Sequence, residues 1–292
     1  MKDGVIKAKI FRFDPSRDAA PRYETYEVPR KEEGMLVGDV LMYIYENIDP
    51  SLAFRWECRA RQCGACGVMI NGRPGLICKE RAPDVMLLEP LCVRPVIRDL
   101  VVDIGRVADR LNPWFEMEKP GSQEAQVFPE ENRKAYRQAE ACIECYMCEA
   151  MCAVKSTNPD AIKEFAGPRS FARLSRNIYY PRDEADWVEI GAEYGLFNCV
   201  VCQFCNEVCP KEVNPADIIA ELEYRVVGRN IDVTGVRKVK AWTDSIRRTA
   251  RAEGVRIRLK AKGLGALTDV SQAVRLALRK KLPWPFRRPK GV

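Results

Sequence analysis

Cysteine is the residue type that decides which chemistry this chain can perform. The 292 residues include 13 cysteines and no histidine. Twelve of the cysteines form three groups of four, near residues 60, 145 and 205. A chain without imidazole can form no His-ligated haem, no Cys–His zinc finger and no Ser-His-Asp triad, which leaves thiolate as the main metal ligand. The cysteines are therefore candidate ligands for metal-based chemistry.

Disulfide bonds explain these cysteines poorly. A chain of this length can bury two ordinary cores without cross-links, and an odd number of cysteines cannot all pair. Residues 1–13 alternate charged and apolar side chains and do not form the apolar run of a secretory signal peptide. We therefore expect the thiols to bind metal and not to pair with one another.

The first group has the spacing C-x4-C-x2-C followed by a distant fourth cysteine. Its members are Cys58, Cys63, Cys66 and Cys78. Plant-type 2Fe–2S ferredoxins have this spacing, with one loop around the cluster and a distant thiolate as the fourth ligand. Gly64 and Gly67 allow such a loop to turn its backbone N–H groups toward the cluster. We predict a 2Fe–2S site here; the alternatives are a zinc knuckle or scattered buried cysteines.

The second and third groups repeat one eleven-residue pattern, C-x2-C-x2-C-x3-C. The runs are Cys142, Cys145, Cys148, Cys152 and Cys199, Cys202, Cys205, Cys209, and Pro210 follows the second run. In two-cluster bacterial ferredoxins the fourth cysteine of each run binds the other run's cluster. We therefore assign one 4Fe–4S cluster to Cys142, Cys145, Cys148 and Cys209, and a second to Cys199, Cys202, Cys205 and Cys152. Zinc is the alternative, although structural zinc more often takes pairs of cysteines from two knuckles.

Other residues near these groups have weaker signals. Cys92 stands outside all three groups, and we predict that it is a small buried apolar side chain. Arg59, Arg61 and the backbone amides beside Gly64 are candidates for tuning the first cluster.

The first hundred residues have the pattern of a small, largely β domain. Alternation predicts strands at residues 5–13 and 23–28, and apolar spacing predicts one helix at 38–48. Residues 67–70 and 76–77 flank an Asn-Gly turn and predict a hairpin, with a last strand at 85–88. Two hairpin-like pairs with one helix across them favour a β-grasp sheet.

The remainder of the chain has a helical pattern. Helices are predicted at residues 133–142, 170–177, 185–194, 215–227, 234–251 and 268–281. The predicted fold class is α+β: a β-grasp plant-type 2Fe–2S ferredoxin domain (1–108), a linker (109–132), an all-α bacterial-type two-cluster ferredoxin domain (133–230) and a basic helical C-terminal extension (231–292).

Beyond the cysteines, two segments resemble the iron–sulfur subunit of succinate dehydrogenase and fumarate reductase. They are EPLCVRPVIRDLVVD at residues 89–103 and CPKEVNP at 209–215. The resemblance covers about residues 5–230. It implies an electron-transfer subunit with one 2Fe–2S cluster and two further clusters in line. It also implies an FAD-containing flavoprotein partner that holds the site for succinate and fumarate, so no catalytic residue is expected on this chain.

The chain departs from that family in ways that concern the electron acceptor. Common members lack a cysteine at the position of Cys202 and hold a 3Fe–4S cluster, so a complete ligand set here predicts 4Fe–4S. Residues 153–156 (Ala-Val-Lys-Ser) and Val200 replace the Pro, Trp and His of the family's quinone pocket. The acceptor is therefore either a quinone-linked membrane anchor or a cysteine-rich subunit akin to heterodisulfide reductase, as in thiol-linked fumarate reductases. No apolar run approaches the length of a membrane span, which predicts a cytoplasmic protein peripheral on the inner face of the cell membrane.

The C-terminal extension is strongly basic. Residues 231–292 carry 17 Lys and Arg against 4 Asp and Glu, or +13, whereas residues 1–230 carry 31 against 37, or −6. One interpretation is two surface helices packed on partner subunits; another is attachment to an anionic membrane surface, with Trp284 and Phe286 as an interfacial anchor. Nucleic-acid binding is not expected, because no recognition motif accompanies the charge.

Two hypotheses from other classes compete with electron transfer. A zinc-binding interaction module would contain zinc and no iron. A reductase acting alone would need its own flavin or substrate pocket, and the sequence has no Gly-rich dinucleotide fingerprint.

Overall fold

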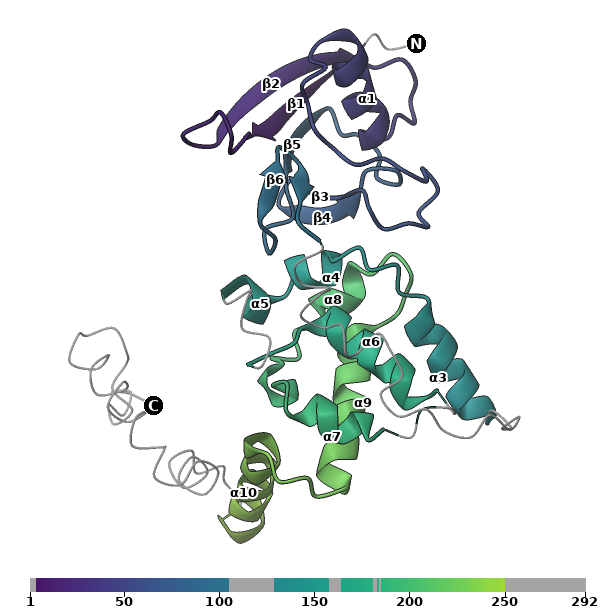
Figure 1. The fold of residues 1–292 in the computed structure, drawn as a ribbon, viewed down its shortest axis with the longest axis vertical. Coiled ribbons are helices and arrows are strands. Elements are labelled where there is room, and N and C mark those ends of the chain that lie inside the picture. Colours follow the sequence, from purple (N-terminus) through teal and green to yellow (C-terminus); the bar gives the residue numbers. More distant parts are fainter. Residues whose placement is uncertain (1–3, 105–128, 158–163, 181–182, 184, 250–292) are drawn as a thin grey trace, which may run out of the picture. The chain divides into compact units, whose positions relative to one another are not determined.

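The computed structural model of this protein describes residues 4–104, 129–157, 164–180, 183 and 185–249. The chain divides into two compact units, residues 1–224 and residues 225–292. In the first unit an N-terminal β-sheet is followed by a set of short helices (Figure 1). Within the described residues, no helix is long and apolar enough to cross a membrane.

A five-stranded sheet forms the N-terminal part of the first unit. Its strands are β1 Val5–Arg12, β2 Arg22–Pro29, β3 Gly67–Ile70, β4 Arg73–Leu76 and β5 Val85–Glu89, in the spatial order β2-β1-β5-β3-β4. β1 and β5 are parallel, and the other neighbouring pairs are antiparallel. With helix α1 (Val37–Asn47), this sheet is the β-grasp arrangement predicted from the sequence.

The alternation of side chains in β1 explains how the sheet is anchored. Ile6, Ala8 and Ile10 are fully buried, because every second side chain of a strand points to the same face. Helix α1 contributes Leu41 and Ile44 to the same core. The loop that carries the first three cysteines connects α1 to β3, and Cys78 follows β4 by two residues. The apolar core therefore fixes both ends of the first cysteine group.

The β3–β4 hairpin turns at the predicted Asn-Gly pair. Asn71 has φ 50° and Gly72 has φ 78°, as a two-residue type I′ turn requires. β4 begins earlier than the predicted residues 76–77 and includes Pro74. Because β4 is an edge strand, the missing N–H of Pro74 is tolerated.

A buried ion network ties the end of this domain to the sheet. Strands β6 (Val96–Arg98) and β7 (Val101–Val102) form a small second sheet, and the buried Asp99 lies between them. The Nε of Arg12 donates to Asp99 Oδ1 at 3.1 Å, and the backbone N–H of Phe13 donates to the same oxygen at 2.9 Å. The segment after the sheet is thereby held against β1.

The remaining elements are helical. They are α3 Glu130–Glu140, α4 Met147–Ala150, α5 Ala153–Thr157, α6 Pro168–Ile178, α7 Trp187–Ala192, η2 Leu196–Asn198, α8 Phe204–Glu207, α9 Pro215–Gly228 and α10 Thr234–Thr249. Helix α7 is shorter than the predicted 185–194, because Asp186 caps it by accepting from Glu189 N at 3.1 Å. The predicted helix at 268–281 and most of the predicted linker lie outside the described residues.

Candidate iron–sulfur sites

The first cysteine group lies in a loop whose backbone is shaped around Cys58. Backbone N–H groups of Ala60, Gln62 and Cys63 donate to Cys58 Sγ at 3.4, 3.3 and 3.3 Å. Residues with left-handed φ produce this convergence: Arg59 (55°), Arg61 (58°) and Gly64 (69°). The sequence prediction of inward-turned amides therefore matches the loop geometry.

These amides alter the acidity of the first group. Hydrogen bonds from the backbone, that of Ala60 first among them, lower the pKa of Cys58 to about 6. Burial has the opposite effect on Cys66 and raises its pKa to about 12. The Sγ atoms of Cys66 and Cys78 lie 3.4 Å apart. The loop thus combines one exposed, stabilised thiolate with a buried pair of sulfurs, which suits a shared metal centre.

An aromatic contact supports the same loop. The guanidinium of Arg59 stacks over the ring of Trp56, with its Cζ 4.4 Å from the ring centroid. That ring in turn covers the start of α1, where a Cβ on Gly38 would lie 2.8 Å from it. Arg59 therefore packs against this loop, and its tuning of the first cluster stays a prediction.

Four cysteines from both later runs line one cavity. Cys142, Cys145 and Cys148 meet Cys209 around one shared space. The remaining lining is mostly apolar and includes Ile143, Ala172, Val213 and Pro215. This is the set assigned from the sequence to the first 4Fe–4S cluster.

A second cavity gathers the other four cysteines. Cys199, Cys202, Cys205 and Cys152 line this space, together with Val154, Phe165 and Ile219. Among the described residues, no three His, Cys, Asp or Glu side chains lie close enough to share a single ion. The donors and the space in each cavity fit a thiolate-held cluster.

The sequence repeat is also a repeat of backbone conformation. Glu144 and Val201, at the same position in the two runs, have φ 52° and 53°. Tyr146 and Gln203, two residues later, have φ 61° and 62°, and each precedes a four-residue helix, α4 or α8. Left-handed φ is rare for residues other than glycine. The repeated strain shows that each run is bent to direct three sulfurs at one point.

Burial makes several thiols of the two cavities harder to deprotonate. Burial raises the pKa of Cys145 to about 12 and the pKa of Cys205 to about 12. Burial also raises the pKa of Cys148 well above its ordinary value. Thiols in such surroundings lose their protons when a metal takes their place, so metal loading releases protons.

Close packing brings the first group against the second. A Cβ added to Gly64 would lie 2.2 Å from Ile143 O and 3.2 Å from the Cβ of Cys145. Cys66 and Cys145 line one further hollow. Met147 of α4 and Val208, which follows α8, are part of the apolar core of the β-grasp domain. The helical part of the first unit therefore packs on the core of the sheet through α4 and the residue after α8.

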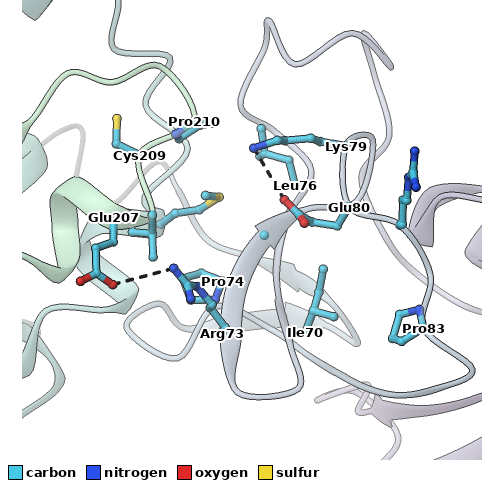
Figure 2. A pocket seen from close by; sticks show the side chains of 14 residues that line it. Ile70, Arg73, Pro74, Leu76, Lys79, Glu80, Pro83, Glu207, Cys209 and Pro210 are labelled. Atoms are coloured by element: carbon cyan, nitrogen blue, oxygen red, sulfur yellow. Dashed lines mark ion pairs between the residues drawn. The ribbon is translucent and has the colours of Figure 1, made fainter.

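A charged hollow lies on the same junction (Figure 2). It is lined by β4 on one side and by the segment that contains Cys209 and Pro210 on the other. Across it, Arg73 Nη2 and Glu207 Oε2 form an ion pair at 3.9 Å. Its lining also includes Lys79, Glu80 and Arg81.

A buried aromatic and ionic cluster escaped the sequence analysis. Tyr146 is buried between two guanidinium groups, with Arg94 Cζ 4.2 Å and Arg169 Cζ 4.8 Å from its ring centroid. Arg94 also pairs with the buried Glu149. Arg94 and Glu149 are 55 residues apart in sequence, so no local pattern connects them. Arg169 and Tyr146 also line the first cavity, so this cluster forms part of its wall.

The prediction for Cys92 was wrong. Its side chain is exposed, and its Sγ contacts Ala150 O at 3.4 Å. It lies on the segment after β5, where the neighbours Leu91 and Val93 are the ones that turn inward.

Comparisons with known proteins agree with these sites. The chain matches the family model of the 2Fe-2S iron-sulfur cluster binding domain over residues 7–109 and that of the 4Fe-4S dicluster domain over residues 138–213. The fumarate reductase iron-sulfur subunit of Haemophilus influenzae is 34% identical over 236 residues, covering 74% of this chain and 90% of that protein. The chain belongs to the fumarate reductase and succinate dehydrogenase iron–sulfur subunit family. The role of this subunit is electron transfer.

Two further relatives extend the comparison. A subunit of the fumarate reductase (CoM/CoB) of Methanothermobacter marburgensis is 37% identical over 222 residues, or 75% of this chain. The chain spans less than half of that longer protein, 44% of its length. In the solved Mycobacterium smegmatis Sdh1 complex in the apo form, one chain matches with a TM-score of 0.71 and 29% identity. That match covers 79% of this subunit and 98% of the solved chain.

Proposed function

We propose that this subunit relays single electrons between an FAD-containing flavoprotein, which interconverts succinate and fumarate, and a second partner subunit. The observation that carries the proposal is the pair of cavities, each lined by four cysteines drawn from both runs. Bound clusters, one 2Fe–2S and two 4Fe–4S, would supply the one-electron steps. Cys58, Cys63, Cys66 and Cys78 would hold the first; the two crossed sets of four would hold the others.

The chain's own residues arrange the three sites in series. Gly64 brings the first loop against Ile143 and Cys145 of the second site. Burial first, and then neighbouring groups that include Cys205, raise the pKa of Cys148, so the second and third groups are also electrostatic neighbours. Apolar side chains around both cavities exclude water, which limits reorganisation during electron transfer.

Exposure suggests where electrons enter and leave. Cys58 and Cys63 are exposed at the first site, and Cys202 is exposed at the third. Around Cys202 the large apolar side chains of Val200 and Val201 are 60% and 57% exposed, and Phe204 is 42% exposed. Adjacent exposed apolar side chains favour a docking surface for a protein partner. We place the flavoprotein at the first loop and the second partner at this apolar loop.

The second partner has two candidate identities. A membrane anchor that carries quinone is one, as in quinone-linked members of the family. Cys202 and Val200, together with residues 153–156, favour the other: a cysteine-rich, heterodisulfide-reductase-like subunit of a thiol-linked fumarate reductase. Cys202 lines the second cavity beside Cys152, Cys199 and Cys205. A complete thiolate set supports a 4Fe–4S cluster, with a lower potential than a 3Fe–4S cluster. Purification of the native complex distinguishes the two, because one contains haem or quinone and the other further cysteine-bound iron.

Helix α10 supports attachment to the inner face of the membrane. Val239, Trp242 and Ile246 are exposed, at 38%, 53% and 45%, and their spacing puts them on one face of the helix. Basic residues of the same helix, among them Lys240 and Arg247, lie outside this face. Such helices lie in the interface of anionic membranes. Flotation with vesicles containing anionic lipid tests the proposal, and zwitterionic vesicles are the control.

Metal analysis tests the relay itself. The isolated subunit should contain about ten irons per chain, and Cys202→Ser should lower this to about nine with the EPR signal of a 3Fe–4S centre. Cys92→Ser, outside the three groups, is the matched control and should keep all the iron. Zinc without iron would contradict the relay and support an interaction module. About nine irons in the unaltered subunit would contradict the second 4Fe–4S cluster.

A further inference from the structure

One lysine residue lies at both of the first two candidate sites. Lys211 lies two residues after Cys209 and lines the cavity formed by Cys142, Cys145, Cys148 and Cys209. Its Nζ donates to Gln62 Oε1 at 3.0 Å, across 149 residues of sequence. Gln62 belongs to the first loop, between Cys58 and Cys63. The hydrogen bond therefore joins the walls of two separate sites.

The partner of this ammonium is itself part of the first site. The backbone N–H of Gln62 donates to Cys58 Sγ at 3.3 Å. A side chain held by Lys211 restricts the backbone that makes this bond. The two loops cannot separate easily, because Gly64 packs against Ile143 O with no room for a Cβ. Lys211 is thus held near both sites by packing as well as by its own hydrogen bond.

We propose that Lys211 is a positioning residue that raises the reduction potentials of the first two centres together. The inference rests on the proposed function, since it requires that both sites hold clusters. Reduction adds negative charge to a cluster, and a nearby cation stabilises the reduced form. Because one charge acts on both centres, it favours loading of both and leaves the driving force between them nearly unchanged. Lys211 also fixes the Gln62 amide that stabilises Cys58.

The expected effect is moderate because Lys211 is half-buried and Gln62 is exposed. Solvent and salt screen such a charge, with a Debye length of about 10 Å at 0.1 M salt. At a fixed applied potential, Lys211→Met should lower the ratio of reduced to oxidised cluster about threefold to tenfold in each of the two centres. A tenfold change corresponds to a shift of about 59 mV in the reduction potential. Lys211→Arg keeps the charge and should stay within about twofold of the parent subunit.

The test is an EPR-monitored redox titration of the full-length, iron-loaded subunit at low and at high salt. Lys7→Met is the matched control: it also removes one positive charge, but Lys7 pairs with Glu27 on the β1–β2 hairpin. The proposal is supported if Lys211→Met lowers the reduction potentials of both centres in parallel at low salt and lowers them less at high salt. Lys7→Met should leave both potentials unchanged. Unchanged potentials, a shift of one centre alone, or an equal shift in Lys211→Arg would overturn the proposal.

A second variant keeps the proposal testable if Lys211→Met loses iron. Gln62→Leu retains the charge and removes the hydrogen bond, so the 2Fe–2S centre should shift and the neighbouring 4Fe–4S centre should not. A Gln62→Leu subunit with both potentials unchanged would refute the positioning role. If the proposed electron relay is wrong, the unaltered subunit will lack iron. If only the role of Lys211 is wrong, the subunit will contain about ten irons and Lys211→Met will leave both reduction potentials unchanged.

Discussion

The contact between Gly64 and the second cysteine run can be tested with a single methyl group. Gly64 has φ +69°, and a Cβ at this position would lie 2.2 Å from Ile143 O. Gly72 has a similar φ, +78°, but a Cβ there would meet nothing within 4 Å. Gly64→Ala therefore adds a backbone collision to the conformational strain, and Gly72→Ala adds the strain alone.

The two contributions can be estimated separately. A Cβ in the left-handed region costs about 1–2 kcal/mol, and overpacking of a tight contact costs about 1–3 kcal/mol more. Gly72→Ala should therefore destabilise by about 1–2 kcal/mol and Gly64→Ala by about 2–5 kcal/mol. At roughly 2–4 °C per kcal/mol, these costs lower Tm by about 2–8 °C and 4–20 °C respectively.

The assay follows thermal loss of the visible absorbance of the iron–sulfur centres in full-length subunit. EPR of each variant before heating reports whether the 2Fe–2S and neighbouring 4Fe–4S signals are intact. We expect Gly64→Ala to lose these two signals first and Gly72→Ala to retain all signals. Equal Tm values for the two variants would refute the argument, because they would show that the loops of the first two sites do not press on each other.

Other features predict further outcomes. Val201→Gly should stabilise the subunit by about 1 kcal/mol, because a β-branched side chain at φ 53° is strained; Tm measures this. Arg94→Ala should destabilise it by about 3–5 kcal/mol in urea denaturation, since Glu149 is left buried without its partner. Burial raises the pKa of Glu223 to about 7, so its neutral form favours folding below pH 4.5 and this contribution is lost as pH rises through 7. Glu223→Gln should therefore raise Tm more at pH 8 than at pH 5.

Controls make these outcomes decisive. Val200→Gly changes the neighbouring valine, whose φ is not positive, so a gain in both valine variants would argue against strain at Val201. Combining Arg94→Met with Glu149→Leu should recover much of the stability, and a double variant as unstable as Arg94→Ala would show that the ion pair is not the cause. An equal gain for Glu223→Gln at both pH values would exclude titration of that carboxyl.

Much of the fold was predictable because its signals are local. Alternation in residues 5–12 and 22–29 and the Asn-Gly turn specify the sheet, since each depends on the two-residue period of a strand or on φ > 0. The cysteine spacing also predicted which thiols the structure brings together in the two later cavities. Crossing of the fourth cysteines follows from a known architecture and could not be calculated from the runs themselves.

The remaining features depend on contacts between distant residues. Tyr146, Arg94 and Glu149 come from different segments, so neither periodicity nor a motif connects them. Helices α4 and α8 have four residues each, which is too short for an apolar period to be visible. In the segment after β5, Leu91 and Val93 point inward and Cys92 between them points outward. Three consecutive apolar residues do not by themselves indicate which of them faces the core.

The exchange of fourth cysteines between the runs also bears on assembly and repair. A chain emerging from the ribosome has the whole of its first run long before Cys209 exists, so neither cavity can be completed until the third group has been synthesised. Oxidation of Cys152 or Cys209 would likewise remove a ligand from the site of the opposite run. The two sites should therefore mature together, and each depends on one sulfur that the other run supplies.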